Sequence, residues 1–94
     1  MKIKLIQYVN IESDIAPYFW EKTYESSIMP IIGNKIQDSL WKDPYEYKIE
    51  DVVIDYKENE CTVTMEKYSH EIPKERVEEI SKLAQLHGWT TYLK

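Results

Sequence analysis

Histidine, cysteine and carboxylate side chains are the groups in this chain that could carry metal, nucleophilic or acid–base chemistry. The two histidines are His70 and His87. Neither has a cysteine or carboxylate at a spacing typical of metal ligands, and His70-Glu71 lacks the second histidine of a zinc-protease motif. The sequence therefore predicts no metal site, with His87 near a helix end and His70 in a loop.

The single cysteine, Cys61, excludes an internal disulfide and a cysteine zinc cluster. It lies in the same alternating phase as Val63 and Met65, so we interpret it as a small apolar side chain of a half-buried strand. No neighbour in the sequence would lower the pKa of its thiol. A role as nucleophile is not expected.

Carboxylates gather around the middle of the chain, where a pair could in principle act as general acid and base. They are Glu50, Asp51, Asp55, Glu58 and Glu60. A solvated strand face and a charged hairpin tip explain this pattern without catalysis. The chain has only two glycines, which lie far apart, so a glycine-rich phosphate loop is absent. We therefore expect a protein that is not an enzyme and has no cofactor.

Aromatic residues are the remaining candidates for a functional role. Eight tyrosines, three tryptophans and one phenylalanine are more than the core of a 94-residue chain is expected to bury fully. Exposed tyrosine and tryptophan are favoured in protein interfaces. The candidate interface residues form two groups, Tyr18, Phe19, Trp20 and Tyr24, followed by Trp41, Tyr45 and Tyr47. The alternative, that each group covers a thin core, remains open.

The leading hypothesis is a small non-enzymatic binding protein with an aromatic-rich protein–protein surface, of which a homodimer is one form. The bias toward isoleucine, lysine, tyrosine and glutamate is typical of AT-rich genomes, and suggests an accessory or inhibitor protein of a phage or mobile element. The alternative is a protein that binds a small ligand such as a nucleotide. Tryptophan and tyrosine would stack on the base, while Lys35, Lys42 or Lys48 would contact phosphate.

The composition of the chain excludes several classes of binding partner. The net charge is −5 and no basic face is concentrated in the sequence, which argues against a duplex-DNA partner. The longest apolar runs, such as residues 28–32, are far shorter than the roughly 20 residues needed to span a bilayer. The N-terminus does not have the apolar core of a signal peptide. We expect a single cytoplasmic domain, with no membrane partner.

Alternating apolar residues predict the strands that position these groups. Lys2–Val9 carries apolar side chains in both phases, as expected for a strand covered on one side and partly on the other. Aromatics and threonine favour a strand over a helix at 17–27, although Ser13 could cap a helix there. Residues 28–32 contain Pro30 and belong at a sheet edge or a strand entry. Residues 35–41 fit a short strand or one helical turn.

The stretch from Tyr45 to Tyr68 predicts a β-hairpin with a turn at 57–60, in which Asn59 is left-handed. The apolar phase of its first strand reverses at Glu50-Asp51, which indicates a β-bulge. Gly33-Asn34 predicts a turn with positive φ, and Asp43-Pro44 a break.

Residues 73–87 predict an amphipathic helix that Gly88 ends. Its apolar stripe is Val77, Ile80, Leu83, Ala84 and His87. Residues 89–93 would form a final strand or a packed tail. The predicted fold is α+β: a small, strongly bent antiparallel sheet or partial barrel of about five strands, with this helix packed on it.

Overall fold

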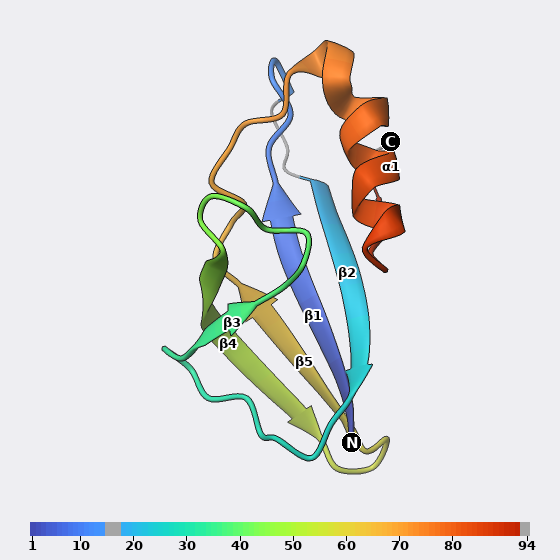
Figure 1. Ribbon diagram of the computed structural model, residues 1–94. Helices are drawn as coiled ribbons and strands as arrows, with labels where there is room; N and C mark the ends of the chain where they lie inside the picture. The colour runs from blue at the N-terminus through green and yellow to red at the C-terminus, as the bar shows by residue number, and fades with distance from the viewer. Residues whose placement is uncertain (15–17, 93–94) are drawn as a thin grey trace.

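The computed structural model describes residues 1–14 and 18–92. Within them the chain forms one six-stranded mixed sheet and one helix near the C-terminus (Figure 1). The elements are β1 (Lys2–Val9), β2 (Tyr18–Glu25), β3 (Lys35–Gln37), β4 (Glu46–Asp55), β5 (Glu60–Met65), a 3-10 turn η1 (Lys74–Arg76), α1 (Val77–Leu86) and β6 (Thr90–Thr91). The α+β class is therefore confirmed, as is the choice of a strand for residues 18–25; Pro17, the first residue of the predicted range, lies outside the described residues.

Strand β1 occupies the middle of the sheet, whose order is β3-β4-β5-β1-β2-β6. It pairs antiparallel with β2 and parallel with β5, so that Ile3 lies opposite both Tyr24 and Cys61. The fully antiparallel sheet predicted from the sequence is wrong because β5 returns beside β1 in the same direction. The strand count differs as well, six in place of about five, and the sheet is not closed but ends at the short strands β3 and β6.

The β4–β5 hairpin has the predicted irregularity. Its register shifts between Ile49 and Asp51, so one extra residue of β4 is accommodated there. Asn59 in the turn has a φ of 54°, the expected left-handed conformation. The bulge allows apolar side chains from both halves of β4, such as Ile49 and Val52, to face the same side of the sheet.

A long connection between β2 and β4 crosses one face of the sheet (Figure 1). It begins with the apolar residues 28–32 and turns at Gly33, whose φ is 92° as predicted. After the three residues of β3, the N–H of Trp41 bonds to the carbonyl oxygen of Asp38 at 3.1 Å. Of the two predicted alternatives for residues 35–41, the short strand is therefore confirmed, and it is followed by a turn that is not part of a helix.

The helix begins later than the predicted residue 73. Pro73 has an extended ψ of 138°, and residues 74–76 form the 3-10 turn before α1. At the other end Gly88 has a φ of 89°, and its N–H donates to the carbonyl oxygen of Gln85. A short β6 then pairs with β2, as one of the two predicted alternatives requires. Leu93, at the end of that predicted range, lies outside the described residues.

The core lies between the sheet and the segments that cover one of its faces. Its buried apolar side chains are Ile3, Leu5, Val9, Ile11, Trp20, Leu40, Trp41, Tyr47, Ile49, Cys61, Val63, Met65, Ile72, Ala84 and Trp89. From the helix only Ala84 is fully buried, with Val77 and Ile80 partly so. Leu83 of the predicted stripe remains 47% exposed. None of the helices in the described part of the chain is long and apolar enough to cross a membrane.

Candidate functional site

The centre of the core contains a glutamine. Gln7, on β1, is completely buried. Its Oε1 accepts hydrogen bonds from the indole N–H groups of Trp20 and Trp41, at 3.0 and 2.9 Å. Its Nε2 donates to the backbone carbonyl of Glu66 at 3.0 Å. One side chain from the middle strand thus joins β2, the connection before β4 and the end of β5.

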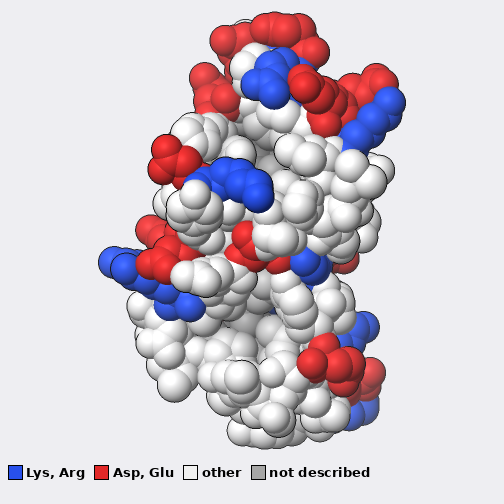
Figure 2. Space-filling view, viewed as in Figure 1, with Lys and Arg blue, Asp and Glu red and all other residues white. Residues whose placement is uncertain are grey.

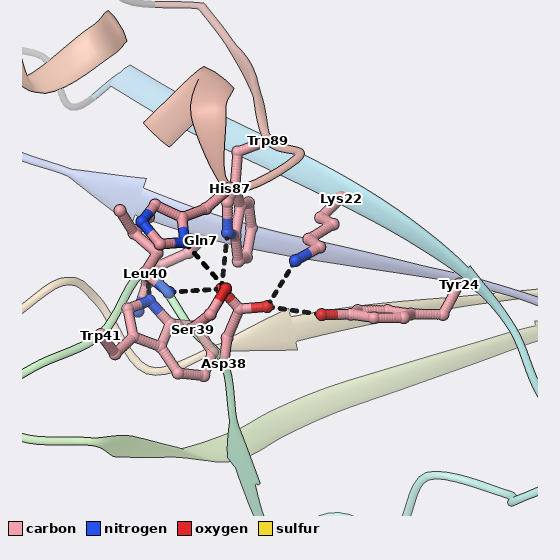
Figure 3. A network of polar contacts seen from close by, with 9 residues as sticks. All are labelled: Gln7, Lys22, Tyr24, Asp38, Ser39, Leu40, Trp41, His87 and Trp89. Carbon is pink, nitrogen blue, oxygen red and sulfur yellow. Dashed lines mark hydrogen bonds and ion pairs between the residues drawn. The ribbon is translucent and has the colours of Figure 1, made fainter. Parts of the chain in front are cut away.

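Asp38 forms a second polar centre beside the first (Figure 3). Its carboxylate, which is fully buried, accepts from the Lys22 ammonium at 2.8 Å and from the Tyr24 hydroxyl. Its other oxygen accepts from the Trp89 indole and from the backbone N–H of Leu40, each at 2.9 Å. We call Gln7, Trp20, Asp38, Trp41 and Trp89 the tryptophan network.

The electrostatics of Asp38 follow from these contacts. Burial by itself would raise the pKa of the carboxyl group, but the hydrogen bonds from Lys22 and Tyr24, together with those from Leu40 and Trp89, outweigh it and lower the pKa. The pKa of Tyr24 is raised, first by burial and then by its bond to Asp38. Asp38 is therefore held as a carboxylate and Tyr24 as a neutral phenol.

The buried polar groups of the tryptophan network are all hydrogen-bonded. Every buried side-chain nitrogen and oxygen of the described residues has a hydrogen-bond partner. A general base needs an open approach for the proton that it removes, and both oxygens of Asp38 are occupied. The nearby Ser39 hydroxyl is likewise bonded to Nδ1 of His87, at 2.8 Å. The arrangement holds the connection between β2 and β4 onto the sheet.

The other groups that could do chemistry stay apart. Cys61 is buried on β5, where burial raises the pKa of its thiol. His70 bonds through Nε2 to the backbone carbonyl of Asp43 at 2.7 Å. No cluster of three potential metal ligands occurs within residues 1–14 and 18–92. Glu50 and Asp51 are exposed at the bulge.

The structure divides the seven candidate interface residues among different environments. Three of them lie in the core, namely Trp20, Trp41 and Tyr47. The other four, Tyr18, Phe19, Tyr24 and Tyr45, keep exposed surface. They do not form one patch, because Tyr18 and Tyr24 face the core side of β2 whereas Phe19 faces the opposite side.

An aromatic cluster does lie on that opposite face. Phe19 stacks on Tyr92 with ring centroids 4.6 Å apart and contacts Tyr8 at 5.9 Å. The Tyr92 hydroxyl donates to Glu21 at 3.2 Å. Sequence reasoning missed Tyr8 and Tyr92 here, because only the register of β1, β2 and β6 brings them beside Phe19.

The most exposed run of apolar side chains lies elsewhere, in residues 28–32, here called the 28–32 segment. Ile28 is 80% exposed, Ile31 and Ile32 are each 59% exposed, and Met29 is 43% exposed. In Figure 2 the lower part of the molecule, where this segment crosses the sheet, is largely free of charged side chains.

A groove lies behind the 28–32 segment. Its volume is about 420 Å³, and its floor includes Ile3, Leu5 and Ile49 of the sheet. Ile36 and Tyr24 line its sides. We call the 28–32 segment and this groove the apolar surface. Its signal in the sequence was the apolar run itself, which the presence of Pro30 led us to interpret only as a sheet edge or strand entry.

Of the three lysines proposed for phosphate contacts, Lys35 and Lys48 lie opposite each other on β3 and β4, and Lys42 lies apart from them. Lys35 forms an ion pair with Glu46 at 3.2 Å. Lys48 is exposed on β4. Lys42 lines a different groove, beside α1. Comparisons with protein-family models, with curated proteins and with solved structures found no match to this chain.

Proposed function

We propose that the protein is a small non-enzymatic binding protein that acts through a protein–protein surface, and that this is the apolar surface. The observation that carries the proposal is the exposure of four large apolar side chains within five consecutive residues. Folding gains little from side chains left in water, and a contiguous exposed apolar patch is a typical mark of an interaction site.

The chemistry of the apolar surface favours a protein partner. Most of its apolar side chains are isoleucines, which gain free energy when another apolar surface excludes water from them. The net charge of −5 repels nucleic acid and anionic lipid headgroups. A protein partner with an apolar contact surface satisfies both conditions.

The partner that fits the geometry is a second copy of the chain. The apolar surface places protruding side chains, Ile28 above all, directly beside a groove with an apolar floor. In a two-fold dimer the same patch contacts itself, so a projection on one copy meets the groove of the other. The isoleucines of each copy would then occupy the groove of its partner.

The test is the mass of the protein in solution, measured by light scattering and sedimentation over a wide concentration range. We expect a concentration-dependent dimer. The double variant Ile28→Ser and Ile32→Ser removes the protrusion and should give a monomer with an unchanged circular-dichroism spectrum. Val53→Ser is the matched control, because Val53 is 57% exposed but lies on β4 outside the apolar surface.

Two results would contradict the proposal. One is a wild-type protein that stays monomeric at the highest concentration tested. The other is a dimer that survives the double isoleucine substitution, which would place the interface elsewhere, for example at the Tyr8, Phe19 and Tyr92 cluster.

A further inference from the structure

A second groove lies at the other end of the covered face, between α1 and the connection before β4. Figure 2 shows the surface recessed there, below the helix. Its volume is about 430 Å³, within the range of about 300–1,000 Å³ that is typical of small-molecule sites. Its apolar lining consists of Trp20, Leu40, Pro44, Ile72, Pro73, Ile80 and Leu83.

Tyr68 supplies a polar group inside this groove. Its ring lies near two other aromatic rings of the lining, with centroids 5.2 Å from Trp20 and 6.3 Å from Tyr47. Burial raises the pKa of the phenol, so the hydroxyl keeps its proton at neutral pH. Among the described residues that hydroxyl makes no side-chain hydrogen bond, whereas the Tyr47 hydroxyl is bonded to Ser69. Tyr68 is thus a fixed donor without a partner in the fold.

Arg76 stands near the same phenol. Both residues line the groove, and the positive charge of Arg76 acts to lower the pKa of the Tyr68 phenol, although burial outweighs it. Only Nε of Arg76 is engaged, with Glu79 at 3.0 Å, so the terminal N–H groups remain available. An oxygen of a carboxylate or phosphate placed between the two residues would accept from both. Hydrogen bonds in which the donor or the acceptor is charged are stronger than those between neutral groups.

Lys42 adds a second positive charge to the lining. In the described part of the chain it has no carboxylate within ion-pair distance, while the carboxylates of Asp43 and Glu71 also line the groove. With two cations and two carboxylates these groups carry no net charge, which disfavours a polyanion such as a nucleoside triphosphate.

We propose that this groove binds a small organic acid, a molecule with one apolar or aromatic body and one carboxylate or phosphate group. The body lies against Pro44, Ile80 and Leu83, and the acidic group accepts hydrogen bonds from Tyr68 and Arg76. This site is separate from the apolar surface and does not depend on dimerisation.

The experiment is a titration of the whole chain, labelled with ¹⁵N, followed by amide chemical shifts. The probes are phenyl phosphate and 3-phenylpropionate, which distinguish phosphate from carboxylate, and 3-phenylpropanol as the neutral counterpart. We expect saturable shifts in the groove with at least one acid, and weaker binding of the alcohol. Shifts with neither acid would overturn the proposal, as would equal binding of the alcohol.

Variants distinguish binding of the ligand in this groove from nonspecific binding elsewhere on the protein. Arg76→Gln removes a charged donor and should weaken binding about tenfold; Tyr68→Phe removes a neutral donor and should weaken it about fivefold. Lys48→Gln, which removes an exposed lysine outside the groove, is the control and should leave affinity unchanged. Unchanged affinity in both Arg76→Gln and Tyr68→Phe would contradict the proposed site. The amide spectrum of each variant confirms that it is folded.

Discussion

The tryptophan network and the apolar surface lie against the same face of the sheet, but their large side chains are in opposite environments. In the network, large aromatic rings are buried and each indole N–H is hydrogen-bonded, to Gln7 or to Asp38. In the apolar surface, aliphatic side chains without any polar group are left in water. The first region contributes to the stability of the fold, and the second is free to contribute to binding. Substitutions in the two regions should therefore separate stability from association.

The largest expected effect is that of Gln7→Leu. This change leaves the indole N–H groups of Trp20 and Trp41 buried without an acceptor, and each orphaned group costs about 1–3 kcal/mol. We expect the free energy of unfolding to fall by about 3–5 kcal/mol, measured by urea denaturation. Gln37→Leu makes the same chemical change at an exposed position and is the control. Equal effects at the two positions would mean that the network does not stabilise the fold.

Asp38→Asn tests the second half of the network. It removes the charge that accepts from the largely buried Lys22 ammonium, and should cost about 2 kcal/mol at neutral pH. Because the folded-state pKa of Asp38 lies below that of the unfolded chain, about 3.9, its contribution is present above that pH and is lost as the pH falls further.

The pH dependence of the loss of stability in Asp38→Asn is a more specific test than the size of that loss at neutral pH. The difference in unfolding free energy between wild type and Asp38→Asn should shrink as the pH is lowered below about 4. Asp51→Asn, which removes an exposed carboxylate of β4, is the control. A difference for Asp38→Asn that grows in acid would contradict the direction of the shift.

Alanine substitutions at the two glycines test the backbone next to each of the two regions. Both have a positive φ, which costs an alanine about 1–2 kcal/mol. At Gly33, beside the apolar surface, an added Cβ would meet no atom within 4 Å; at Gly88 it would lie 3.2 Å from Cε of Lys22. Gly88→Ala should therefore lower the thermal midpoint more than Gly33→Ala, because Lys22 is tied to Asp38. Equal shifts would show that Lys22 moves freely.

The smallest expected effect on stability is that of Ile28→Ser with Ile32→Ser. Exposed positions of this kind change the free energy of unfolding by about 0.5 kcal/mol or less, although the same variant should lose the dimer. Unfolding should be measured at a concentration where the wild type is monomeric. A loss comparable to that of Gln7→Leu would mean that the 28–32 segment belongs to the core.

Features set by a few neighbouring residues could be predicted from the sequence. The reversal of phase at Glu50-Asp51 predicted the bulge, and Gly33 and Asn59 predicted their left-handed turns. The parallel pairing of β1 with β5 could not be predicted, because both strands are amphipathic and nothing in either pattern specifies its neighbour.

The same limit applies to the candidate sites. Whether Trp20 and Trp41 are core or surface depends on Gln7, one polar residue on β1 that can accept from both indoles. The groove beside Tyr68 exists only because α1 and the connection before β4 meet over it. By contrast, the apolar run of residues 28–32 is visible in the sequence, and only its exposure required the structure.

The central position of β1 has a consequence for how the chain acquires its fold. Ile3 on β1 pairs with Cys61 on β5, so the formation of this central strand pair closes a very long loop of the chain. Such distant pairings slow folding. During synthesis, β1 and β2 emerge as a hairpin that exposes one edge of β1 and the side chains of Ile3 and Leu5 until β5 has been made. Until then that edge is open to pairing with a neighbouring nascent chain, and completion of β5 removes the hazard.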